Sequence, residues 1–162
     1  ARSGRALVVR RIITRANEGA GEDHDTLTKE EFDCRKRRGA FSLAWEAHGL
    51  RYGLPAATDE AIRRGKVTVA NLSRGAIASL RKRYANVKVV QVTASPGILA
   101  ARLAVRGRES ADEIRDRIAR NADFGRVIPG AVTIANEGRA DDAGELLVAL
   151  IRQSIREIAG EP

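Results

Sequence analysis

Two arginines flank a glycine in the segment Arg106-Gly107-Arg108, just before a predicted helix. Ser110 and Glu113 have the S-x-x-E spacing of a capping box, which predicts that the helix begins directly after Ser110. A guanidinium is a planar, permanently charged fork that binds phosphate oxygens in a bidentate way. Two such forks on a glycine hinge can cover a phosphoryl group while it is transferred. A solvated basic turn between two helices is the alternative interpretation.

Composition points to ligands that carry negative charge. The 162 residues have a net charge of +8 and 43% hydrophobic side chains, which predicts one globular domain with a real core. Aromatic residues make up only 4%, and no basic stripe is interleaved with them. This argues against a nucleic-acid partner. No apolar run approaches the roughly 20 residues of a membrane span, so no membrane partner is expected. We therefore expect small phosphorylated ligands.

The single cysteine, Cys34, falls inside a predicted helix and cannot form a disulfide within the chain. The first residues lack the apolar segment of a signal peptide. Both observations fit a reducing cytoplasm, which is the expected location. The sequence leaves the oligomeric state open, a homo-oligomer included.

Strand and helix patterns alternate along most of the chain. Strands are expected at 7–9 (buried), 41–45, 67–70, 87–92 and 131–135. Helices are expected at 28–38, 58–64, 74–84, 96–105 (with Ser95 as N-cap), 111–123 and 141–158. The pattern predicts an α/β fold, a parallel sheet wrapped by helices, in a single domain over 1–162. Residues 12–53 break the alternation and are predicted to form an inserted lobe. Ligands should bind at the carboxyl ends of the strands, near the loops after residues 70, 93 and 135.

A set of short motifs follows in a characteristic order: Ile13-Thr14-Arg15, Glu22-Asp23-His24, Glu31-Phe32, residues 45–53, Gly65-Lys66, residues 71–74, Arg102-Leu103, residues 106–110 and Asn136. Together they resemble the guanylate-kinase-like group of P-loop kinases over nearly the whole chain. Within that group the chain is most similar to the ribose 1,5-bisphosphate phosphokinases of phosphonate metabolism. The resemblance implies use of ATP and Mg²⁺. It also implies transfer of the γ-phosphoryl group to ribose 1,5-bisphosphate, which gives phosphoribosyl diphosphate (PRPP).

Base recognition separates the members of that group. Guanylate kinases have a guanine-reading acid where this chain has Leu43, and a second one where we align Ser73. Leu43 cannot accept hydrogen bonds from guanine, and a site without its acceptor loses discrimination by orders of magnitude. These residues favour a sugar phosphate as acceptor. Two alternatives remain: a guanylate kinase or other nucleoside-monophosphate kinase with altered base recognition, and a binding module without catalysis.

The resemblance also implies roles for individual residues. A lid over 106–117 would supply catalytic arginines: Arg106, Arg108 and Arg117. The acceptor would be bound by Arg15, His24, Tyr52, Ser73 and Arg74. Asn136 would lie beside the adenine of ATP. No metal-ligand spacing is found, so no residue is assigned to a metal.

Each of these residues also has a plain structural interpretation. Arg117 can pair with Glu113 one turn away. Arg15 and Arg74 can be surface charges, and Asn136 can belong to an ordinary turn. Tyr52 can be an aromatic residue that packs the lobe. His24 is expected in a polar loop, where it can simply be solvated.

The phosphate-binding loop of the group is missing from these residues. The only Gly-Lys pair, Gly65-Lys66, precedes a predicted strand instead of following one, and Glu60 stands where the motif needs glycine. The chain also contains no methionine. We therefore expect roughly 25 to 35 further residues upstream, the size of one strand–loop–helix unit. The parallel sheet formed by these 162 residues should then be interrupted, because its central strand belongs to that unit.

Overall fold

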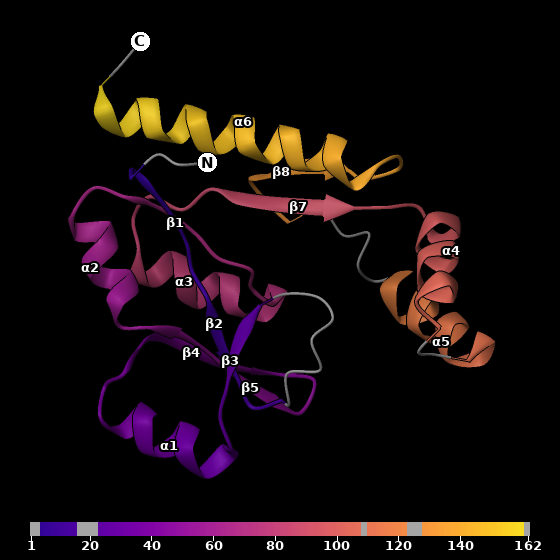
Figure 1. Cartoon of the computed structure of the whole chain (residues 1–162), viewed down its shortest axis with the longest axis horizontal. Helices are drawn as coiled ribbons and strands as arrows, with labels where there is room; N and C mark the ends of the chain where they lie inside the picture. Colours follow the sequence, from indigo (N-terminus) through magenta and orange to yellow (C-terminus); the bar gives the residue numbers. More distant parts are fainter. Residues whose placement is uncertain (1–3, 16–22, 108–109, 123–127, 161–162) are drawn as a thin grey trace. The chain divides into compact units, whose positions relative to one another are not determined.

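The computed structural model describes residues 4–15, 23–107, 110–122 and 128–160 (Figure 1). The contacts divide the chain into two units. The first comprises Ala1–Val87 with Ile151–Pro162, and the second comprises Lys88–Leu150. Among the helices of the described ranges, none has the length and apolarity that crossing a membrane requires.

A four-stranded mixed sheet forms where the inserted lobe was predicted. Its strands are β2 (Arg11–Ile13), β3 (His24–Thr26), β4 (Phe41–Ala47) and β5 (Leu50–Pro55), in the order β3-β2-β5-β4. β2 pairs with β3 in parallel and with β5 in antiparallel fashion, and β4 and β5 form a hairpin. His48 (φ 52°) and Gly49 (φ 73°) make its two-residue turn, which requires positive φ at both positions.

Helix α1 (Lys29–Arg37) covers one face of this sheet. It confirms the predicted helix, because the capping box at Thr28 and Glu31 is present in both directions. Phe32, which is 1% exposed, packs with Ile12 and Leu27 in the core of the lobe. The lobe therefore has a core of its own, and this core fixes the sheet on which the predicted acceptor residues lie.

Two further strands of the first unit, β1 (Ala6–Val8) and β6 (Val67–Val69), pair in parallel. Helix α2 (Ala57–Arg63) lies between the lobe and β6 in sequence, and a 3₁₀ turn (Arg74–Ala76) leads into α3 (Ile77–Arg83). The strand expected at 7–9 is present as β1, but its expected burial is wrong: Leu7 is 37% and Val8 77% exposed, and only Val9 is buried. The physical reason is that β1 has β6 as its only paired strand among the described residues.

The second unit contains the parallel pair β7 (Val89–Thr93) and β8 (Ala131–Ala135). Helices α4 (Pro96–Arg106) and α5 (Ala111–Ala122) connect the two strands, and α6 (Ala140–Ala159) follows β8. Ser110 and Glu113 form the predicted capping box of α5. Ser95 does precede α4, but its side chain makes no capping hydrogen bond. Its backbone N–H instead donates to Glu137 Oε1 at 2.8 Å.

Outside the lobe, the parallel strands of the described residues form two two-stranded sheets, β1-β6 and β7-β8. These two pairs belong to different units of the chain. The expected interruption of one parallel sheet by a missing central strand therefore stays a prediction.

Candidate functional site

The register of the lobe sheet brings several predicted acceptor residues onto one face. Directly opposite residues share a face, and the pairs are Arg11 with His24, Trp45 with Tyr52, and Leu43 with Leu54. Ile13 lies opposite Tyr52 and two residues from Arg11. The pairs that contain Arg11 and Tyr52 therefore lie on the same face of the sheet. We call this side of the sheet the Tyr52 face.

The opposite side, the α1 face, holds the carboxylates of the sheet. Asp25 lies opposite Ile12, and Glu46 lies opposite Arg51. Arg51 forms an ion pair with Asp33 of α1 at 2.7 Å, and this contact connects the sheet to the helix. Strand alternation thus separates the charges: among the described residues of these four strands, the Tyr52 face carries no Asp or Glu.

Tyr52 and Trp45 form the centre of the Tyr52 face. Their rings stack at 5.4 Å between centroids with 11° between planes. The indole Nε1–H of Trp45 donates to Ser73 Oγ at 2.9 Å. This bond connects the face to the loop that follows β6, where a ligand edge was predicted. The Ser73 hydroxyl accepts from Trp45 and retains its own O–H for donation.

His24 does not lie in a polar loop, so that expectation is wrong. It is a residue of β3, paired with β2, and is 3% exposed. Alternation turns His24 toward the Tyr52 face, while Asp23 and Asp25 stay exposed and pair with Arg10. A buried imidazole on this face can bind an anion or hold a neighbouring group in place.

Arg11 is a further candidate site residue, which the sequence interpretation did not name. It is 8% exposed, and its guanidinium carbon lies 5.4 Å from the centre of the Tyr52 ring. Arg11 stands two residues before Ile13, and alternation along a strand places both side chains on one face. This spacing could have predicted that Arg11 shares the face of Ile13. The adjacent Arg10 is exposed. The sequence alone does not tell which of these two neighbouring arginines is buried.

Arg15 lies just beyond the end of β2, with an exposed side chain on an anchored backbone. Its carbonyl accepts from Thr26 Oγ1 at 3.0 Å. The preceding Thr14 accepts from the backbone N–H of Arg51 at 2.9 Å. Arg15 can thus reach a ligand from a fixed position. Arg74 begins the 3₁₀ turn directly after Ser73 and is half-buried.

Gly53 of the motif around Tyr52 has a packing role. A Cβ at this position would come within 2.6 Å of the Phe41 ring. That ring stacks on Phe32 of α1 at 4.5 Å, so it cannot move away without disturbing the core. Only glycine therefore allows this close approach, which keeps the strand that carries Tyr52 in register.

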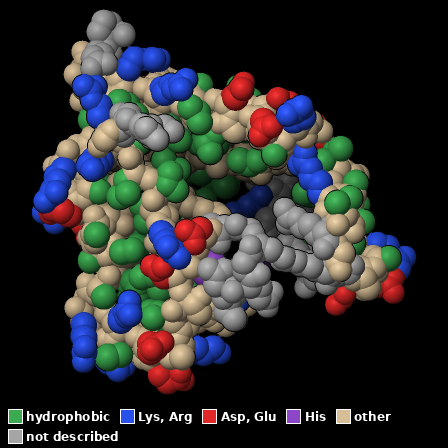
Figure 2. Space-filling view, in the orientation of Figure 1, with side chains coloured by type: hydrophobic (Ala, Val, Ile, Leu, Met, Phe, Trp, Pro, Cys, Tyr) green, Lys and Arg blue, Asp and Glu red, His purple; other side chains and the backbone are tan. Residues whose placement is uncertain are grey.

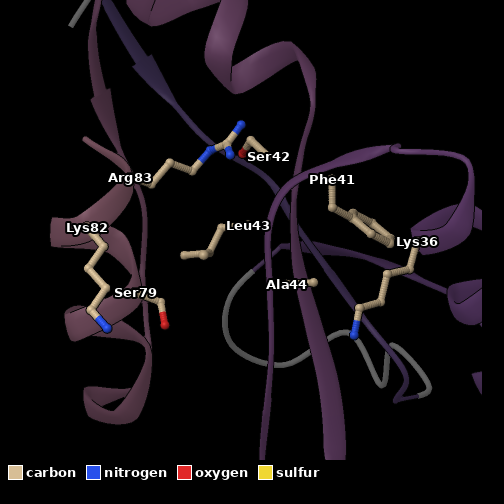
Figure 3. A pocket seen from close by; sticks show the side chains of 8 residues that line it. All are labelled: Lys36, Phe41, Ser42, Leu43, Ala44, Ser79, Lys82 and Arg83. Carbon is tan, nitrogen blue, oxygen red and sulfur yellow. The ribbon is translucent and has the colours of Figure 1, made fainter.

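Leu43 borders an open hollow of about 640 Å³ at the edge of β4. Figure 3 shows its side chain pointing toward Ser79 and Lys82 of α3. The other side chains at the hollow include Lys36 and Arg83, and no carboxylate lines it. The described surroundings of Leu43 thus offer no carboxylate to pair with the N–H groups of a guanine base.

In the second unit, the ends of β7 and β8 lie together as predicted for the ligand edge. The N–H of Asn136 donates to Thr93 O at 2.7 Å. Arg102 of α4 donates to Asn136 O at 2.9 Å, to its Oδ1 at 3.2 Å and to Gly138 O at 2.6 Å. Arg102 belongs to the motifs quoted above but was given no role; the structure identifies it as the residue that holds the Asn136 loop.

The lid arginines are only partly within the described residues. Arg108 lies outside them, as do the side chains of Arg106 and Arg117. The backbone on both sides is defined: α4 ends at Gly107 (φ 63°) and α5 begins after Ser110. Hydrogen bonds with the backbone N–H and the hydroxyl of Ser110 hold the pKa of Glu113 below its usual range.

No group of three or more potential ligands for a metal ion occurs within the described residues. We therefore assign no residue to Mg²⁺ and derive no step through the metal. On the face drawn in Figure 2, some Lys and Arg side chains lie beside Asp and Glu, and others lie apart from them.

Comparison with known proteins gives a consistent result. The chain is 45% identical over 152 residues to ribose 1,5-bisphosphate phosphokinase PhnN of Chelativorans sp. (strain BNC1), a match that covers 94% of this chain and 73% of the relative. It is 39% identical to the protein of the same name in Agrobacterium fabrum, with 90% and 79% covered. No family model matches the chain.

Among solved structures, guanylate kinase from Anaplasma phagocytophilum superposes with a TM-score of 0.61 at 16% identity, covering 95% of this chain and 79% of that one. This likeness confirms the guanylate-kinase-like fold. The sequence identity to relatives that span most of the same length shows the family: the chain belongs to the ribose 1,5-bisphosphate phosphokinases of the PhnN type.

Proposed function

We propose that the protein transfers the γ-phosphoryl group of ATP to the 1-phosphate of ribose 1,5-bisphosphate, giving ADP and PRPP. A new bond forms between a 1-phosphate oxygen and the γ-phosphorus, and the bond from that phosphorus to the bridging oxygen of ADP breaks. The nucleophile is already a phosphate oxygen, so no strong general base is needed. Positioning and charge neutralisation then contribute most of the catalysis.

The observation that carries this proposal is the composition of the Tyr52 face. It combines Arg11, His24 and Tyr52 with Leu43, and no described residue of its strands there is a carboxylate. Guanine presents N–H donors and needs acceptors, whereas a sugar bisphosphate presents anionic oxygens and needs donors. The face therefore fits the sugar bisphosphate and not the base.

In the proposed complex, Arg15, His24, Tyr52, Ser73 and Arg74 bind the acceptor. Arg106, Arg108 and Arg117 neutralise the transferred group, and Asn136 lies beside the adenine. The phosphates of ATP need a glycine-rich loop that these 162 residues do not contain. Mg²⁺ would enter with ATP, since this ion is commonly bound through substrate phosphates. We also propose a cytoplasmic location, where both substrates are found.

The test is an ADP-release assay on the protein as its gene encodes it, with ribose 1,5-bisphosphate and GMP offered separately. We expect turnover with the sugar bisphosphate and at most background release with GMP. Efficient GMP turnover would favour the nucleoside-monophosphate kinase instead. No release with either acceptor, despite measurable binding, would favour the binding module.

A further inference from the structure

We infer that Trp45 is a positioning residue for the acceptor. Its indole N–H donates to the Ser73 hydroxyl, so that Ser73 offers its own proton to an oxygen of ribose 1,5-bisphosphate. This inference rests on the proposed function, in which Ser73 binds the acceptor. It adds the residue that determines how the Ser73 hydroxyl is oriented.

The Ser73 hydroxyl is not used at the helical turn that Ser73 precedes. Ser73 is the N-cap residue of the 3₁₀ turn Arg74–Ala76, a position where a serine hydroxyl ordinarily accepts from a backbone N–H of the turn. It makes no such capping bond. Its Oγ instead lies 2.9 Å from Nε1 of Trp45. The hydroxyl is thus committed to a residue of the Tyr52 face and not to its own turn.

The chemistry of the two groups fixes the direction of this hydrogen bond. The indole Nε1–H is a donor only, whereas a serine hydroxyl donates once and accepts through two lone pairs. Ser73 must therefore be the acceptor, and its own proton is directed elsewhere. No other residue of the described chain accepts that proton. A sugar phosphate supplies the matching acceptor oxygens, whereas the N–H groups of guanine do not.

The indole of Trp45 is itself held in place. Trp45 lies directly opposite Tyr52 in the β4–β5 hairpin, and the two rings stack at 5.4 Å between centroids with 11° between planes. Such cross-strand aromatic pairs stabilise one ring orientation, and the plane of the ring fixes the direction of the N–H. A strand of the lobe thus orients a hydroxyl in the loop after β6, 28 residues along the chain.

The test is a double-mutant cycle on acceptor binding. Calorimetric titration with ribose 1,5-bisphosphate gives the dissociation constants of the protein as its gene encodes it, of Trp45→Phe, of Ser73→Ala and of the double variant. Ser73→Ala should weaken binding about 10- to 100-fold, because a hydrogen bond to a charged group is lost. Trp45→Phe keeps a ring beside Tyr52 but removes the N–H, so binding should weaken about tenfold. The double variant should bind within about threefold of Ser73→Ala, because Trp45 acts through that hydroxyl.

Multiplied losses in the double variant, or unchanged binding in either single variant, would overturn the inference. Tyr84→Phe is the matched control, because it removes a hydrogen bond to Asp59 in the same unit, outside the Tyr52 face, and should leave binding unchanged. Ser73→Thr keeps the hydroxyl and should bind within about threefold of wild type. If Trp45→Phe does not fold, equal binding in Ser73→Ala and Ser73→Thr would overturn the inference.

Steady-state kinetics separate positioning from a loss of folded protein. Trp45→Phe should raise the KM for ribose 1,5-bisphosphate about tenfold, with the KM for ATP unchanged and kcat within about threefold of wild type. A lower kcat with both KM values unchanged would indicate a purely structural role and contradict the inference.

Failure of the proposed function gives a different result. In that case the wild-type protein neither binds nor turns over ribose 1,5-bisphosphate, and the inference fails with it. Binding by the wild-type protein, with losses that multiply in the double variant, overturns the inference alone.

Discussion

The lobe around Tyr52 and the unit that carries α4 and α5 differ in how much of each is buried. In the lobe, Ile13, Phe32 and Leu54 are each 1% exposed. In the second unit Ile134 is well buried, but Val105 is 88% and Val92 55% exposed. The lobe is therefore a well-packed support for the proposed acceptor residues, whereas the described part of the second unit leaves more of its large apolar side chains exposed. Segments with few buried apolar contacts open at low cost in free energy, which would suit the nucleotide-binding role that we propose for this unit.

The largest effect is expected in the core of the lobe. Phe32→Ala removes a ring packed against Ile12, Leu27 and Phe41 and should lower the free energy of unfolding by about 3–5 kcal/mol. Denaturant titration gives this value. The matched control is Val105→Ala, at an exposed position of α4, with a change below about 0.5 kcal/mol. Similar losses for both variants would remove the contrast between the two regions.

The next effect concerns the lid, where the resemblance implies a transition-state contact. Arg108→Ala should lower kcat by about 100-fold or more while the KM for the acceptor changes little. Arg108→Lys should restore little activity, since the planar fork is lost. Steady-state kinetics of the protein as its gene encodes it provide both constants. A kcat within about threefold of wild type would show that the lid assignment is wrong.

A smaller effect is expected where α4 holds the loop after β8. Arg102→Ala removes the hydrogen bonds to Asn136 and Gly138 and should raise the KM for ATP about tenfold, since a bond to a charged group contributes about 1.5–3 kcal/mol. The KM for the acceptor should stay the same. Arg115→Ala, at an exposed position of α5 beside Asp112, is the control. Equal changes in the KM for ATP and the KM for the acceptor would refute the proposal that Arg102 affects only nucleotide binding.

The smallest effect is a pH dependence in the first unit. Burial acts to raise the pKa of Asp59, but hydrogen bonds from Tyr84 and Arg83 outweigh it and lower the pKa below the ordinary value of 3.8. Because the folded pKa lies below the unfolded one, the stabilisation is present at neutral pH and is lost as the pH falls through the folded value. Asp59→Asn should thus cost about 0.5–1 kcal/mol at pH 7. Unfolding measured down to about pH 2 should show the difference fade, and a constant difference would contradict the assignment.

The sequence predicted the elements well where local signals are strong. The capping boxes at Thr28 and Ser110 are local, because side chains three residues apart satisfy the backbone groups of a helix start. The glycines that end helices, such as Gly39 and Gly65, have the positive φ expected there. The exposure of Val8 could not be read from its own segment, because burial depends on which strands pair with β1.

The candidate site was predicted in part. Tyr52 and Ser73 were named, but their connection through Trp45 depends on a hydrogen bond between residues 28 positions apart. Arg11 and the burial of His24 were missed because the short strands β2 and β3, three residues each, show too little alternation to be recognised. Arg102 was quoted in a motif, yet its partners Asn136 and Gly138 follow 34 and 36 residues later. The positions of Arg106, Arg108 and Arg117 around a transferred phosphate stay a prediction.

The most direct measurement of the central claim follows the product by ³¹P NMR. The protein as its gene encodes it is incubated with ATP, Mg²⁺ and ribose 1,5-bisphosphate, and with GMP in a parallel sample. If the Tyr52 face selects a sugar bisphosphate, the signal of the 1-phosphate is replaced by the coupled signals of a diphosphate on C1, and GMP remains unchanged. Conversion of GMP to its diphosphate, with ribose 1,5-bisphosphate left intact, would contradict the account.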